Sequence, residues 1–133
     1  MKFLIVFLYF VVSNSYAFDC SYPTAYLEEN NRKYSSRLSV SVNQQEDGYH
    51  VTFLVPSLIG ESNLQNIYIV KKDLNTKNEI FVIPVSTIDQ GVNREGWFNI
   101  NKKSFENLYL YVDYGSECGF SVFRKITDIN LDK

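Results

Sequence analysis

The chain has few of the residues on which enzyme and metal sites usually depend. Its 133 residues include one histidine, His50, and two cysteines, Cys20 and Cys118. A Ser-His-Asp or Cys-His site would require His50, yet the sequence has no Gly-x-Ser-x-Gly segment and neither cysteine lies beside a histidine. One histidine without a free cysteine also leaves too few ligands for zinc. We therefore expect a protein that is not an enzyme, with no bound metal and no cofactor, and we interpret His50 as an ordinary strand residue.

Clusters of basic residues are also missing. The chain has 13 Lys and Arg residues against 15 Asp and Glu residues. Its longest basic runs are pairs such as Arg32-Lys33 and Lys71-Lys72, which suit solvated turns or strand ends. Proteins that bind nucleic acid concentrate positive charge on one surface. We therefore expect no nucleic-acid partner.

The first residues have the pattern of a cleavable signal peptide. Lys2 precedes an apolar stretch from Phe3 to Val12, and the small residues Ser15 and Ala17 then precede a cleavage point. An apolar stretch of about ten residues is shorter than the roughly 20 that a membrane-spanning helix needs. We predict a signal peptide over residues 1–17 and a mature chain without a membrane span. The absence of Asn-x-Ser/Thr sequences favours a bacterial exported protein, either periplasmic or secreted.

Two cysteines in an exported chain are most simply explained by one disulfide. Cys20 lies at the start of the mature chain and Cys118 near its end, so the predicted disulfide encloses almost the whole fold. The segment 18–36 has no clear hydrophobic period, apart from one possible helical turn around Ala25 to Glu29. We interpret this segment as an N-terminal extension that the disulfide ties across one end or face of the domain.

Residues 37–126 have the alternating pattern of β-strands. Leu38, Val40 and Val42 alternate with polar residues, and the alternation resumes after a polar turn, which predicts a hairpin. Seven strands are expected in this all-β domain, at residues 38–43, 49–55, 66–72, 79–85, 96–101, 107–114 and 119–126. Strands of this number and length suit an antiparallel two-sheet sandwich of the immunoglobulin type. Residues 127–133 are predicted to form a polar C-terminal tail.

Some of these strands resemble those of fibronectin type III modules. The segment Val51–Pro56 is similar to the family's second strand, with Phe53 where the family has a buried tryptophan. The segment Ile67–Lys71 is similar to its third strand. Phe105 and Tyr111 have the spacing of its tyrosine corner, in which a tyrosine hydroxyl bonds to the backbone ahead of the sixth strand. The resemblance implies the fold and leaves the function open.

Outward-facing aromatic side chains give the sequence its candidate site. In a fibronectin-type arrangement the third, sixth and seventh strands are neighbours in one sheet. If the aliphatic residues of these strands point into the core, then Tyr68, Tyr109 and Tyr111 point outward and form an aromatic patch with Phe123. The aliphatic residues expected in the core are Ile67, Ile69, Leu108, Leu110 and Val112.

Two alternatives to an exposed patch stay open. The N-terminal extension carries Tyr22, Tyr26 and Tyr34, which could cover the outward rings as a second small cluster. A shift of the strand register by one residue would instead exchange the inward and outward side chains. The single tryptophan, Trp97, is predicted to belong to the core.

These features predict a binding protein. The first hypothesis is an exported protein-binding module of the inhibitor, immunity or adhesion type, which uses the aromatic sheet face or its loops. The alternative is a carbohydrate-binding module in which the tyrosines stack on sugar rings beside hydrogen-bonding groups such as Asp113. The sequence does not identify the partner.

Overall fold

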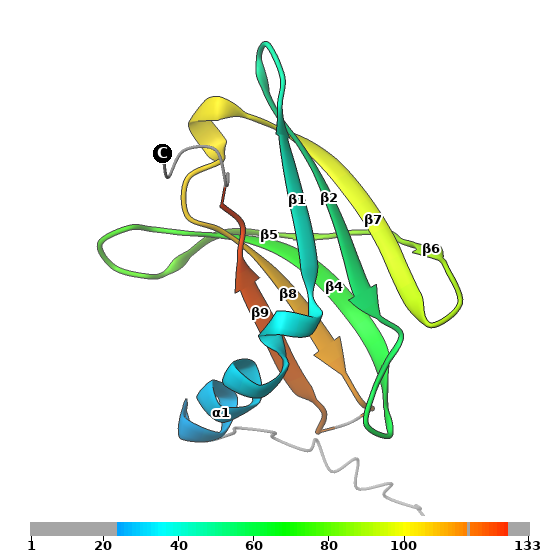
Figure 1. Cartoon of the computed structure of the whole chain (residues 1–133). Coiled ribbons are helices and arrows are strands. Elements are labelled where there is room, and N and C mark those ends of the chain that lie inside the picture. Colours follow the sequence, from blue (N-terminus) through cyan, green and yellow to red (C-terminus); the bar gives the residue numbers. More distant parts are fainter. Residues whose placement is uncertain (1–23, 117, 128–133) are drawn as a thin grey trace, which may run out of the picture.

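Two antiparallel sheets form most of the protein (Figure 1). The computed structural model describes residues 24–116 and 118–127, and the structural statements below concern these residues. The first sheet has the strand order β1-β2-β7-β6. Its strands are β1 (Ser39–Gln44), β2 (Gly48–Pro56), β6 (Ile88–Asp89) and β7 (Asn93–Asn101).

The second sheet has the order β3-β4-β8-β9, with β5 also paired to β4. Its strands are β3 (Leu58–Ile59), β4 (Ser62–Lys72), β5 (Glu79–Pro84), β8 (Leu108–Tyr114) and β9 (Phe120–Lys125). The all-β class and the antiparallel pairing predicted from the sequence are therefore confirmed. The structure also has two short 3-10 helices among the described residues, η1 (Ser35–Arg37) and η2 (Lys102–Ser104).

The predicted count of seven strands is wrong, because the described residues form nine. Each predicted strand has a counterpart, and the two additional strands, β3 and β6, have two residues each. A period of two cannot be recognised in so short a segment. Strand β4 begins at Ser62 instead of the predicted Asn66. The sequence did not indicate its first four residues because all of them except Leu64 are polar.

The core lies between the sheets, and the predicted alternation is confirmed along β8 and from Ile67 to Ile69 of β4, whereas Val70 after them is buried as well. The five aliphatic side chains expected inside are at most 4% exposed, namely those of Ile67, Ile69, Leu108, Leu110 and Val112. Strand β8 alternates between buried and half-buried residues along its whole length. The register of this strand is fixed because a shift by one residue would expose all of its buried side chains.

A helix replaces the single turn expected in the N-terminal extension. Helix α1 (Thr24–Tyr34) packs against β9 (Figure 1). Its partly buried residues are Leu27, Asn30, Asn31 and Tyr34, which have the i, i+3, i+4, i+7 spacing of one helix face. Because the two central positions of this face are asparagines, the sequence has no apolar period from which the helix could be predicted.

Polar side chains hold the segment around α1 to the edge of the second sheet. The side-chain oxygen of Asn31 accepts a hydrogen bond from the backbone N–H of Phe123 at 2.7 Å. The Arg124 guanidinium donates to the carbonyl of Leu38, which follows η1. Strand β9 is an edge strand of the sheet, so the Asn31 side chain satisfies a backbone N–H of β9 that β8 leaves unpaired.

The tyrosine corner expected at Tyr111 is not formed. The hydroxyl of Tyr111 accepts a hydrogen bond from the Lys72 ammonium instead of bonding to the backbone. The buried tyrosine contact between the sheets comes from Tyr114, whose hydroxyl donates to the Pro56 carbonyl at 2.9 Å. Since β8 and β2 belong to different sheets, this bond connects the two layers.

Other predictions fall partly or wholly outside the described residues. The signal peptide, Cys20 and all but the first residue of the predicted C-terminal tail lie there, so the disulfide and the cleavage stay predictions. Cys118 is exposed in the turn between β8 and β9. None of the described helices has the length and apolar character needed to span a bilayer.

Candidate functional site

The four predicted site residues lie together on the outer face of the second sheet. Tyr68 pairs with Tyr111 across β4 and β8, and Tyr111 pairs with Phe123 across β8 and β9. Tyr109 lies two residues before Tyr111 on the same face. The third, sixth and seventh predicted strands are therefore neighbours, and their aromatic residues gather as the sequence indicated. Their role in binding stays a prediction.

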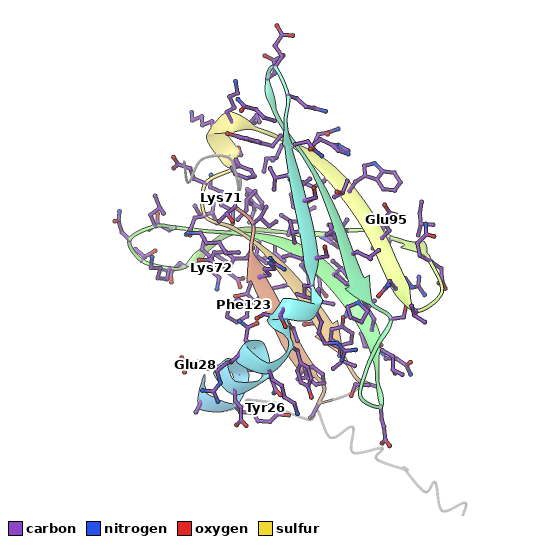
Figure 2. The ribbon with its side chains drawn as sticks, viewed as in Figure 1. Tyr26, Glu28, Lys71, Lys72, Glu95 and Phe123 are labelled. Atoms are coloured by element: carbon purple, nitrogen blue, oxygen red, sulfur yellow. The ribbon has the colours of Figure 1, made fainter. Side chains whose placement is uncertain are left out.

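Three of the rings pack closely on one another. Tyr111 and Phe123 stack with centroids 5.1 Å apart at an interplanar angle of 16°. Tyr109 meets both of them edge-on, at 6.4 and 6.3 Å. The Lys72 ammonium lies 5.0 to 5.8 Å from the centroids of these three rings. Figure 2 labels Lys72 and Phe123 of this cluster. These contacts occupy ring faces that a sugar would need, so the cluster is not a flat exposed platform.

Larger exposed apolar side chains lie elsewhere, along one side of the sandwich. Ten large hydrophobic side chains are exposed among the described residues, and five of them are on β5, on β6 or on β7. These five are Ile80 (57%), Val82 (45%), Ile83 (50%), Ile88 (50%) and Trp97 (52%). Ile83, Ile88 and Trp97 line one hollow, and Ile80 and Val82 lie on the same strand as Ile83, so we call this side of the sandwich the open edge.

A groove between the two sheets adjoins the open edge. It consists of two adjacent hollows of about 430 and 420 Å³ that share Ile83, Val85 and Phe98. The apolar side chains along the first hollow are Ile69, Phe81, Ile83, Val85, Phe98 and Ile100. Of the residues that the structure describes, none with a charged side chain lines either hollow. The groove therefore favours an uncharged, apolar ligand.

The strands on both sides of the groove have unpaired edges. Among the described strands, β5 pairs only with β4, and β6 covers β7 only at Arg94 and Glu95. The backbone N–H of Val85 donates to the Ile67 carbonyl of β4 at 3.0 Å. In an antiparallel pair every second residue bonds to the partner strand, so the backbone groups of Ile83 and Phe81 also point toward β4. The N–H and C=O groups of Val82 therefore point away from β4, toward solvent.

A turn with several internal hydrogen bonds holds the beginning of β5. One carboxylate oxygen of Asp73 accepts from the backbone N–H groups of Asn75 (2.9 Å) and Thr76 (2.8 Å). These bonds lower the pKa of the Asp73 carboxyl from its usual 3.8, and the bond from Thr76 has a larger effect than the bond from Asn75. The N–H of Asp73 also donates to the Asn78 carbonyl at 2.8 Å. The turn thus fixes the position from which β5 starts.

The prediction that Trp97 belongs to the core is wrong. Trp97 is 52% exposed on the outer face of the first sheet, because Phe98 and Ile100 pack against the core and alternation turns Trp97 outward. The sequence pattern could have indicated this, because Phe98 and Ile100 are two residues apart and share one face of the strand, which leaves Trp97 on the other. On the same face, His50 and Asn99 are paired residues joined by a 2.7 Å contact between the His50 ring Nδ1 and the Asn99 side-chain oxygen.

Comparisons of the chain with protein-family models, curated proteins and solved structures found no match. Within the described residues, no group of three or more His, Cys, Asp and Glu side chains is placed to hold a metal ion. The function is therefore inferred from the geometry of the surface itself.

Proposed function

We propose that the chain is an exported protein-binding module and that the open edge is its binding surface. The observation that carries this proposal is the concentration of half-exposed apolar side chains beside an uncharged groove and two unpaired strand edges. An apolar surface of this kind is costly to leave in water and is typical of protein interfaces. The proposed binding surface therefore differs from the predicted aromatic face, because it lies on the side of the sandwich where β5 forms the opposite edge of the second sheet.

The fold proposed for this module is of the fibronectin type III kind. Among the seven longer strands, β4, β8 and β9 are the third, sixth and seventh, and they are neighbours in one sheet as in that family. The shared sheet of these strands supports the proposal. The missing tyrosine corner at Tyr111 and the N-terminal helix α1 are differences from that family, and neither changes this strand order.

Export and the disulfide belong to the same proposal. Helix α1 begins four residues after Cys20 in the sequence, and it packs on β9, which follows Cys118. Leu27 of this helix lines the same hollow as Gly119. No described cysteine is free. These contacts support a disulfide between Cys20 and Cys118, which mass spectrometry of non-reduced peptides from the native protein would test.

A matched pair of variants tests the binding surface. Ile83 on the open edge and Leu58 on β3 are 50% and 47% exposed, so a photo-crosslinking amino acid can be placed at two equally accessible positions. Each variant would be tested in the native host, and the crosslinked species identified by mass spectrometry. We expect one recurrent protein crosslink at position 83 and none at position 58, and we expect Ile88→Asp, which places a charge along the same hollow, to abolish the crosslink at position 83. Equal labelling at both positions would refute the proposal.

The surroundings of Trp97 favour carbohydrate binding as a second candidate function. Its half-exposed ring lies on a sheet face with polar side chains from neighbouring positions, including His50, Thr52 and Asn99. An exposed ring beside hydrogen-bonding groups suits a sugar better than the packed tyrosines do. On a glycan array, His50→Ala with Asn99→Ala should abolish binding under this hypothesis. The same double variant should leave the crosslink at position 83 unchanged if the partner is a protein.

A further inference from the structure

We propose that the open edge binds an extended peptide, which adds to β5 as a further strand and places alternate apolar side chains in the groove. This inference rests on the proposed protein-binding function and specifies the partner. The partner is defined by its chemistry: an extended segment without charges at the positions that face the groove.

The backbone of β5 supplies the first part of the argument. Because the N–H and C=O groups of Val82 point away from β4, they can pair with a strand on the outer side of β5. At Pro84 the edge offers a carbonyl without an N–H, so pairing is centred on Val82. The five residues from Ile80 to Pro84 span roughly 16 Å at the rise of a β-strand. The bound segment therefore has about five to seven residues.

The groove supplies the second part. Side chains of a strand alternate between its two faces, so every second residue of an added strand would point toward the space between the sheets. That space is lined by apolar side chains, with Phe81 and Ile83 from β5 and Phe98 and Ile100 from β7. A charged side chain would lose its hydration there without finding a partner. The residues of the ligand that face the groove are therefore apolar.

The contrast with the other edge of the sheet supplies the third part. Natural edge strands are usually protected by charges, bulges or a covering segment. Strand β9 is covered by α1, whereas the protection of β5 is confined to its ends, with Glu79, a bulge opposite Lys71 and Lys72, and Pro84. The middle of β5, from Ile80 to Ile83, carries no charge. This is the part of the edge that a partner strand would cover.

A second copy of the chain fits this surface less well. Two copies could pair through their β5 strands, but Phe81 and Ile83 of each copy already line that copy's own groove. Pairing would join the two grooves without filling either. An independent strand brings new side chains to fill the groove, so it is the occupant that we infer.

A designed peptide tests the inference. The probe is an amidated nonapeptide with a fluorophore on its N-terminus, in which Thr and Val alternate between terminal lysines, and binding is followed by fluorescence anisotropy and by the amide NMR signals of β5. We expect saturable binding with the largest shifts at Val82. Alternate backbone nitrogens can be methylated in two registers, one on each edge of the peptide. Methylation of the edge that faces β5 should weaken binding at least tenfold, because it removes the hydrogen-bond donors there, whereas methylation of the other edge should not. Equal binding of both N-methylation registers, or no binding at millimolar peptide, would overturn the inference.

Two substitutions at one position complete the test. Val82→Pro removes the outward N–H, whereas Val82→Thr keeps it and has a similar shape, and circular dichroism verifies that both variants fold. We expect at least a tenfold loss of peptide affinity for Val82→Pro and less than a threefold loss for Val82→Thr. If Val82→Pro left both the peptide affinity and the crosslink at position 83 intact, strand addition would be refuted while protein binding would stand. A concentration-dependent dimer that Val82→Pro abolishes would also overturn the inference, in favour of a second copy.

Discussion

Replacing Tyr114 by phenylalanine tests how the two sheets are held together. The Tyr114 side chain is fully buried, and its hydroxyl donates to the Pro56 carbonyl at 2.9 Å across the sandwich. The substitution removes one buried hydrogen bond and leaves the ring in place. Such a bond contributes about 1 to 2 kcal/mol, the upper end applying where the remaining partner is left unsatisfied. We expect the free energy of unfolding at pH 7 to fall by that amount.

The pH dependence of this difference is the sharper part of the prediction. Burial raises the pKa of the Tyr114 hydroxyl above its ordinary value of 10.0. The neutral hydroxyl of the folded protein contributes its full stability below pH 10, and this contribution is lost as the pH rises and the unfolded chain ionises. The loss is about 1.4 kcal/mol for each pH unit above 10. The advantage of the wild-type chain over Tyr114→Phe should therefore vanish near pH 11 and reverse above it.

Urea unfolding followed by circular dichroism at pH 7, 9, 10 and 11 measures the effect. Other titrating groups are common to both proteins, so their contributions cancel in the difference between the two unfolding free energies. Tyr68→Phe, which removes a hydroxyl from the outer face of the sheet, is the control and should change the free energy of unfolding by less than about 0.5 kcal/mol. A difference between wild type and Tyr114→Phe that is independent of pH would refute the argument.

Three further predictions concern local contacts. Gly96→Ala would bring a Cβ atom within 2.3 Å of Cζ of Phe53, so it should lower the free energy of unfolding in urea by about 1 to 3 kcal/mol. Asn31→Ala leaves the Phe123 N–H without its 2.7 Å acceptor, and we expect a loss of about 1 to 2 kcal/mol with faster hydrogen exchange at that amide. Backbone hydrogen bonds lower the pKa of Asp73 in the folded protein. The stabilising contribution of its carboxylate is therefore present above its unfolded pKa and is lost as the pH falls through its folded pKa. The free energies of unfolding of Asp73→Asn and wild type should converge in an acid titration.

The sequence was most informative where alternation alone determines the structure. In β8, and in β4 from Ile67 to Ile69, aliphatic and aromatic residues alternate, so the inward position of Ile69 and the outward position of Tyr111 could be predicted together. The pairing of these strands follows once they are placed in one sheet. The aromatic cluster of the outer face was predicted for this reason.

Features that depend on contacts between distant segments were not predictable in this way. Helix α1 packs through Asn30 and Asn31, and the acceptor role of Asn31 exists only because Phe123 lies beside it. The open edge was missed for a related reason. The apolar segment of β5 would look the same in a strand buried between two neighbours, and only the topology leaves one side of it unpaired. The exposure of Ile83 is therefore a property of the fold rather than of its own segment.

Val82, in the middle of β5, has no role in the core that would explain its apolar side chain, and a lysine at this position tests the point directly. Val82 is 45% exposed and lies outside the core cluster, so a long polar side chain can reach solvent there. We expect Val82→Lys to change the free energy of unfolding by less than about 0.5 kcal/mol, as surface substitutions usually do, while removing the crosslink at position 83. A charge at this position is also a common way to protect an edge strand, so the variant should not aggregate more than the wild type. If the free energy of unfolding fell by more than about 2 kcal/mol, Val82 would be needed by the fold itself, and the argument that β5 is kept apolar for a partner would fail.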